Sequence, residues 1–191
     1  MDVKLHNLLT DSVTGFWRQA VDLLADIGDW HYSGGETTAR TNGDTVGGHF
    51  RHCLEFVNCF LAGADTGKID YNLRDRDRLV ETDRSRAANE FRRAIENLKT
   101  LAARAAGGES LLVKPEDIAE SGGAQFWCAS SLERELEFMQ SHTIHHYALI
   151  AFKLRAMDFA VPPQFGVAPS TLRYWAAEQE KKRAASAAKN F

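Results

Sequence analysis

Residues 130–157, SSLERELEFMQSHTIHHYALIAFKLRAM, carry the signals that decide the fold. Ser130 followed three residues later by Glu133 forms a capping box, in which the two side chains satisfy unpaired amides of the first helical turn. Apolar residues then recur at helical spacing to the end of this stretch, and the pair Pro162-Pro163 prevents the helix from continuing. The stretch therefore predicts one long amphipathic helix with three histidines in its middle.

Three more segments show the same helical spacing of apolar residues, at residues 3–27, 44–63 and 85–106. A polar connection, residues 64–81, joins the second of them to the third and is long for a compact domain. Residues 110–117 and 124–130 are short extended pieces on either side of a turn with two glycines, and they favour a small hairpin.

The predicted fold class is therefore all-α: an up-down four-helix bundle with a long connection between its second and third helices. The small hairpin precedes the last core helix, and a C-terminal extension follows it. We expect one domain over residues 1–175 and a polar tail over residues 176–191. A helical protein of this size is expected to form a homodimer through an apolar helix face, for which the first helix with Phe16 and Trp17 is the candidate.

Composition restricts the classes of function. The 191-residue chain carries 23 Lys and Arg against 26 Asp and Glu, a net charge of −3, whereas proteins that bind nucleic acid need a basic surface. It has no run of about 18 apolar residues that would span a membrane, and its N-terminus lacks the regions of a signal peptide. Three cysteines without close spacing form neither a disulfide framework nor a cysteine zinc site. We expect a cytoplasmic protein with no nucleic-acid or membrane partner.

Two short histidine clusters lie at residues 49–52 and 142–146. Each helical residue turns by about 100°, so His142 and His146 lie only ~40° apart on successive turns, and their imidazoles can point at one ion. His145 lies ~100° from His146 and fits this pair poorly. The apolar residues on either side of the pair place it on the helix face directed at the bundle core.

His52 on the second helix is a third candidate ligand, because it shares a helical stripe with Phe56 and Phe60. Three neutral imidazoles with an open coordination position form the arrangement that proteins use for catalytic zinc and related divalent ions. The alternative is a set of core histidines that hydrogen-bond to backbone or carboxylate groups. A zincin motif is absent because Thr143 stands at its Glu position, and the Glu-x-x-His pairs of di-iron bundles are absent as well.

With these residues in place, nearly the whole sequence resembles the DinB-like superfamily of metal-binding four-helix bundles. The matching stretches are residues 46–52, VGGHFRH, and residues 141–150, SHTIHHYALI. The resemblance implies that His52, His142 and His146 bind one divalent metal ion, which in relatives is zinc, nickel, iron or manganese. It also points to a low-molecular-weight thiol as cosubstrate, since some relatives are thiol-dependent transferases or isomerases.

The function that these residues favour is a metal-dependent enzyme acting on a small-molecule substrate, either a thiol S-transferase or a small hydrolase. A divalent ion with a vacant position lowers the pKa of a bound water or thiol and so makes a nucleophile. His49 and Glu55, each about one turn from His52, are candidates for a general base or for orienting a ligand histidine. The alternative is a non-catalytic metal-binding or dimeric interaction protein, and a fourth ligand from His49 would favour it.

Overall fold

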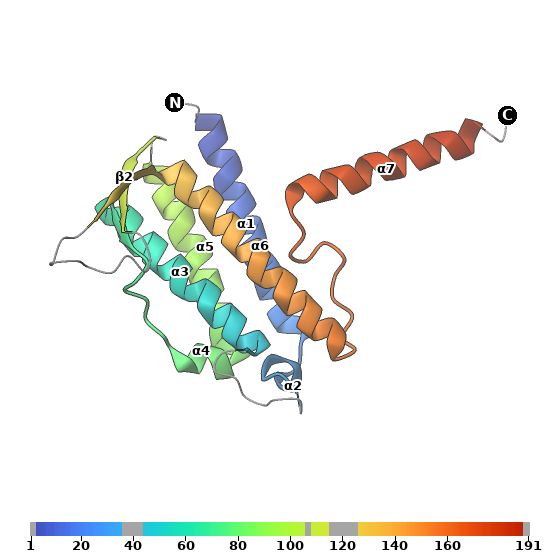
Figure 1. Ribbon diagram of the computed structural model, residues 1–191, viewed down its shortest axis with the longest axis horizontal. Helices are drawn as coiled ribbons and strands as arrows, with labels where there is room; N and C mark the ends of the chain where they lie inside the picture. The colour runs from blue at the N-terminus through green and yellow to red at the C-terminus, as the bar shows by residue number, and fades with distance from the viewer. Residues whose placement is uncertain (1–2, 36–43, 106–107, 115–125, 189–191) are drawn as a thin grey trace.

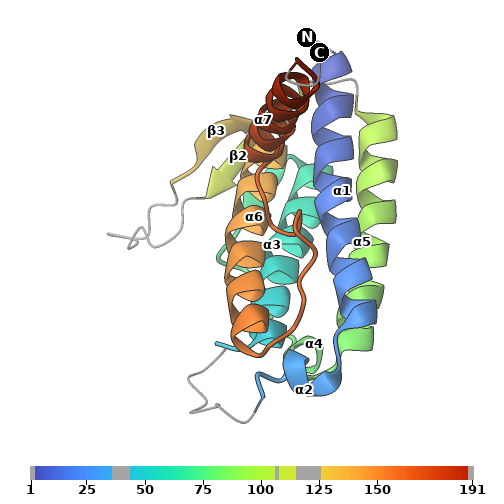
Figure 2. The same ribbon diagram turned by 90° about the vertical axis from the view of Figure 1, so that its right-hand side faces the viewer.

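The computed structural model describes residues 3–35, 44–105, 108–114 and 126–188, and most of them are helical. Four long helices pack against one another along the body of the protein (Figure 1, Figure 2). They are α1 (Val3–Asp26), α3 (Val46–Thr66), α5 (Arg84–Arg104) and α6 (Leu132–Ala156). The shorter or peripheral helices are α2 (Asp29–Tyr32), α4 (Arg78–Thr82) and α7 (Pro169–Ala188). The four helices expected from the apolar spacing agree with the long helices to within a few residues.

Side-chain caps explain where three of the long helices begin. Thr45, Asp83 and Ser131 accept hydrogen bonds from amides in the first turns of α3, α5 and α6. Ser131 takes the place of the predicted cap Ser130, whose hydroxyl instead donates to Glu135 at 2.6 Å. The start of α6 is therefore displaced by one residue from its predicted position.

A three-stranded sheet at one end of the helices corrects the all-α prediction. β2 (Ser110–Lys114) and β3 (Cys128–Ser131) pair antiparallel, in agreement with the predicted hairpin, whose turn at residues 120–123 lies outside the described residues. β1 (Lys68–Asp70) pairs parallel with β2 and was not predicted. Its three residues lie in a polar segment, and the strand that stabilises them lies far along the chain, so the local pattern does not indicate a strand.

The connection after α3 reverses the chain, so the helix directions differ from the predicted up-down order. α3 runs past Gly63, its predicted end, to Gly67, where a φ of 80° turns the chain into β1. Residues 71–77 then return to the opposite end of the helices, where α4 precedes α5 (Figure 1). α3 and α5 consequently both lead into the sheet, whereas α1 and α6 run the opposite way. α3 and α6 are therefore antiparallel neighbours, and the histidine clusters lie on these two helices.

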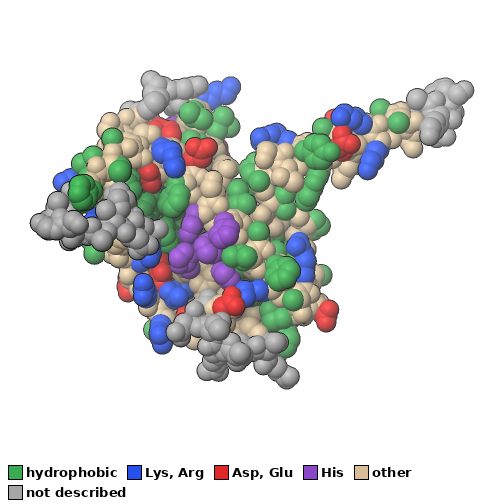
Figure 3. Space-filling view, viewed as in Figure 1, with side chains coloured by type: hydrophobic (Ala, Val, Ile, Leu, Met, Phe, Trp, Pro, Cys, Tyr) green, Lys and Arg blue, Asp and Glu red, His purple; other side chains and the backbone are tan. Residues whose placement is uncertain are grey.

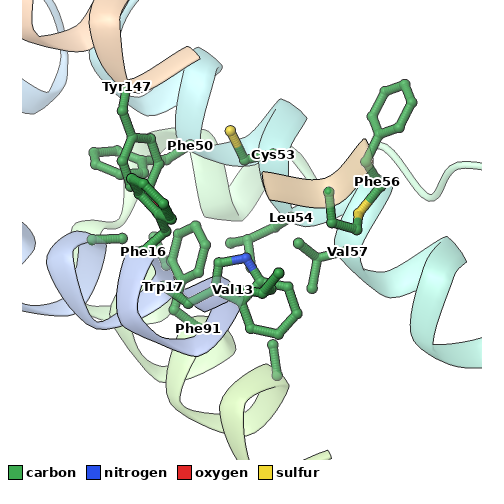
Figure 4. Close-up of a cluster of buried hydrophobic side chains, with 14 of the residues drawn as sticks. Val13, Phe16, Trp17, Phe50, Cys53, Leu54, Phe56, Val57, Phe91 and Tyr147 are labelled. Atoms are coloured by element: carbon green, nitrogen blue, oxygen red, sulfur yellow. The ribbon is translucent and has the colours of Figure 1, made fainter. Parts of the chain in front are cut away.

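Large apolar side chains fill the space between the four long helices (Figure 4). Trp17 from α1, Phe50 from α3, Phe91 from α5 and Tyr147 from α6 are all fully buried. Because Phe16 and Trp17 both belong to this core, the prediction that they form a dimer face is wrong. Their apolar surface stabilises the fold of a single chain instead.

α7 extends away from the four long helices in Figure 1, and residues 173–177 on it are exposed. The helix continues across residue 175, where the sequence suggested that the polar tail begins. Among the described residues, no helix combines the length and the apolar character that crossing a membrane requires.

Gly47→Ala is expected to lower the free energy of unfolding by roughly 1–3 kcal/mol, the usual cost of overpacking a buried site. A Cβ at Gly47 would lie 2.1 Å from the carbonyl oxygen of Glu81 and 2.8 Å from Cε1 of Tyr32, so α3 and α4 would have to separate. Urea denaturation measures the change. The matched control is Gly15→Ala in α1, where a Cβ meets nothing within 4 Å and should raise stability by up to about 1 kcal/mol. Equal stabilities for the two variants would contradict this packing.

Candidate metal centre

The antiparallel helices α3 and α6 bring the two histidine clusters together on one face of the protein (Figure 3). The buried side of α6 includes Thr143 and Tyr147, and His142 and His146 each precede one of them. Successive residues of a helix are rotated by about 100° around its axis, so both histidines point about 100° away from these buried side chains. The pair therefore lies half-buried at the edge of the core and not on the core-facing side that was predicted. This position leaves the imidazoles accessible from solvent on one side.

Three histidines are close enough to share one ion. Nε2 of His52 and Nε2 of His142 face each other at 3.3 Å, and one ligand atom from each of His52, His142 and His146 lies within 4.8 Å of the others. The ring centroid of His146 is 4.6 Å from each of the other two. No other group of three His, Cys, Asp or Glu side chains in the described part of the chain meets this spacing. The structure thus brings together the three predicted ligands.

The electrostatic surroundings keep these imidazoles in the form that binds metal. Burial, followed by repulsion from His52, lowers the pKa of His142 to about 4. Burial, followed by repulsion from His142 and His52, lowers the pKa of His146 to about 3. Both rings are therefore neutral at physiological pH and can offer a nitrogen lone pair to a cation without first losing a proton.

His49 contacts this site without belonging to the group of three. Its Nδ1 lies 3.1 Å from Nδ1 of His146, and its Nε2 lies 3.8 Å from a carboxylate oxygen of Asp44. Lys153 approaches the same carboxylate to 2.6 Å. Burial, with the nearby charge of Lys153, lowers the pKa of His49 to about 4. His49 therefore stands behind His146 as a neutral hydrogen-bonding partner. His145, which fitted the pair poorly in sequence, is exposed and outside the group.

Glu55 lies behind His52 on the side away from the other histidines. Its carboxylate is 3.9 Å from Nδ1 of His52, while the Nε2 of that ring faces His142. Arg51 forms an ion pair with Glu55 and also donates to Glu81 at 3.0 Å, and Arg74 lies 4.0 Å from Glu55. Burial raises the pKa of Glu55, and the two arginines oppose this effect. Buried and paired in this way, the carboxylate is placed to orient His52.

Aromatic rings pack along the histidines. The Phe56 centroid lies 4.2 Å from that of His142 and 4.9 Å from that of His52. Phe138 and Tyr71 extend this wall, at 5.8 Å from His142 and 5.4 Å from Phe56 respectively. The wall restricts access of water to one side of the three imidazoles, which strengthens polar interactions there.

Two members of this wall, Tyr71 and Phe138, were not among the predicted site residues. Tyr71 arrives from the connection after β1, and its hydroxyl donates to Glu135 of α6 at 2.7 Å, so its place depends on the chain reversal. Phe138 precedes His142 by four residues and therefore lies next to it on α6. That spacing was the available signal for Phe138, whereas the sequence around Tyr71 does not indicate that its side chain reaches α6.

Comparison with known proteins does not assign a family to the chain. No protein family and no solved structure matches it. One stretch is similar to FK506-binding protein 5 of Rhizopus delemar, with 37% identity over 107 residues. The match covers 56% of this chain, and the chain spans about a quarter, 27%, of that relative's length. The resemblance to the DinB-like superfamily therefore stays a prediction that rests on the histidine motifs.

Proposed function

We propose that this protein binds one divalent metal ion through His52, His142 and His146 and uses it for chemistry on a small molecule. The observation that carries the proposal is the 3.3 Å between the facing Nε2 atoms of His52 and His142. A tetrahedral ion with imidazole nitrogens at about 2.0–2.1 Å holds pairs of them about 3.3 Å apart. The resemblance to DinB-like proteins supports the same three ligands.

The donor set favours a catalytic over a structural metal. Structural zinc sites are closed by four protein ligands, whereas catalytic sites use three and leave a position for water or substrate. Among the described residues the group has three members, and the side chain of His52 is 35% exposed, so a small molecule can reach it. Imidazole nitrogens suit zinc, nickel and iron better than manganese, which prefers oxygen ligands.

When bound, the ion would lower the pKa of a water or small thiol toward neutrality and so supply a nucleophile. The residues of the chain have separate tasks around it. The neutral rings of His142 and His146 would bind the cation, the Glu55 carboxylate 3.9 Å from Nδ1 of His52 would favour one orientation of that ring, and Phe56 would cover one side of the site. This division of tasks fits a thiol S-transferase or a small hydrolase.

A second function, as a dimeric interaction protein, is favoured by α7. This helix of 20 residues extends from the body with Tyr174 and Trp175 exposed at 63% and 42%. Isolated helices are marginal in water, because most of a helix's stability comes from packing. A homodimer in which α7 packs on a second copy would stabilise it, and light scattering after size-exclusion chromatography measures the mass directly.

The catalytic proposal is tested by turnover of the metal-loaded protein. Wild type loaded separately with Zn²⁺, Ni²⁺, Fe²⁺ or Mn²⁺ is given an activated ester, or a small thiol together with an aryl halide. We expect turnover with at least one ion, and loss of it in His146→Ala under the same loading. If every loaded form reacts no faster than His146→Ala, the non-catalytic alternative becomes the better account.

A further inference from the structure

α3 and α6 carry two pairs of histidines, and in each pair a ring from α3 faces a ring from α6. His52 faces His142 through Nε2 atoms at 3.3 Å, and His49 faces His146 through Nδ1 atoms at 3.1 Å. The helices are antiparallel, so three residues along α3 correspond to four residues back along α6. The His52–His142 pair belongs to the proposed ion site, whereas the His49–His146 pair contributes only His146 to it.

The contact between His49 and His146 determines which nitrogen of His146 is left for an ion. Its Nδ1 already faces His49, so Nε2 is the nitrogen that can join His52 and His142. A neutral histidine that binds through Nε2 keeps its proton on Nδ1. That proton can be donated only to a partner whose facing nitrogen is unprotonated, so His49 must accept at Nδ1 and carry its own proton on Nε2.

The surroundings of His49 fit this tautomer. Its Nε2 is buried and has no hydrogen-bond partner among the described residues, and an Asp44 carboxylate oxygen lies 3.8 Å away. A protonated Nε2 directed toward a carboxylate is favourable, whereas an unprotonated one would face negative charge. Lys153 holds the same carboxylate at 2.6 Å and keeps it beside the ring.

The geometry points to His49 as a positioning residue, which holds His146 in the tautomer and orientation that present Nε2 to the ion. Asp44 in turn sets the tautomer of His49, so that a chain of three residues leads from the surface to the ion. This inference rests on the proposed function, because it requires an ion on His146. It assigns His49 no direct bond to metal, in contrast to the fourth-ligand alternative.

The test compares Co²⁺ binding by wild type, His49→Leu and His49→Asn. Leucine fills the space without a hydrogen-bonding atom, whereas the asparagine side chain places a carbonyl oxygen near the position of Nδ1, where it can accept from His146. Affinity is measured by competition with a chromophoric chelator, and the visible absorption of bound Co²⁺ reports ligand geometry. Thermal unfolding of the metal-free variants separates binding from folding.

We expect His49→Leu to weaken Co²⁺ binding by about 10- to 100-fold and to change its visible spectrum, as loss of a ligand's hydrogen-bonding partner does elsewhere. His49→Asn should recover most of the affinity and the wild-type spectrum. Wild-type affinity and spectrum in His49→Leu, or no recovery in a folded His49→Asn, would overturn the inference and leave the proposed function standing. Absence of Co²⁺ binding by wild type would overturn both.

Discussion

Replacing His142 by alanine is expected to abolish stoichiometric binding of a divalent ion. The variant loses one of three ligands and the nitrogen that lies 3.3 Å from Nε2 of His52. Loss of a ligand's hydrogen-bonding partner weakens metal binding by roughly 10- to 100-fold. Because His142 is itself a ligand, the affinity of the variant for the ion should fall by more than that. Isothermal titration with Zn²⁺ or Ni²⁺ measures the change on protein without a histidine tag.

His145→Ala is the matched control for that prediction. His145 lies on the same helix, and its ring centroid is 5.0 Å from that of His146, but it is exposed and outside the group of three. We expect its affinity to stay within a few-fold of wild type. Equal losses in the two variants would show that the measured binding reflects the general density of histidines and not the three-histidine site.

Trp17→Ala is expected to lower the free energy of unfolding by about 3–5 kcal/mol, the usual cost of removing a large aromatic side chain from a core. Trp17 of α1 is fully buried within the cluster of apolar side chains shown in Figure 4. Since domains of this kind have a total stability of roughly 5–15 kcal/mol, the variant should unfold at much lower urea concentration or fail to accumulate.

Trp175→Ala provides the comparison for the core prediction, because it removes the same side chain from a site that is 42% exposed on α7. We expect a change within about 0.5 kcal/mol, as for most surface substitutions. A change for Trp17→Ala as small as that expected for Trp175→Ala would contradict the placement of Trp17 in the core. A loss for Trp175→Ala as large as that expected for Trp17→Ala would show that α7 is packed in solution.

The sequence contained enough to predict the three ligands, because two of them are related by helical geometry alone. The spacing of His142 and His146 depends only on the pitch of α6, which the apolar pattern predicts. His52 could be added because it lies on a second long helix, in a stripe with Phe56 and Phe60. The burial of His142 and His146, however, was predicted wrongly. Thr143 and Tyr147 take the core-facing positions on α6, and the sequence does not reveal that a threonine will be preferred there over a histidine.

The features that the sequence did not reveal all depend on contacts between distant segments. β1 is stabilised by pairing with β2, which lies far along the chain, and no local pattern indicates that residues 71–77 return to the far end of the helices and make α3 and α5 parallel. The contact between Tyr71 and Glu135 likewise joins segments that lie far apart in the sequence. His49 was a candidate for several roles, and its contact with His146 became visible only once the antiparallel packing of α3 and α6 was known.

The most direct test of the proposed metal centre is the metal content of the purified protein by plasma mass spectrometry, without a histidine tag and before any metal is added. We predict about one divalent ion per chain in wild type, or uptake of one ion per chain on reconstitution. Protein that contains no ion and takes up none of Zn²⁺, Ni²⁺, Fe²⁺ or Mn²⁺ would contradict the account, and the three histidines would then be a polar cluster at the edge of the core.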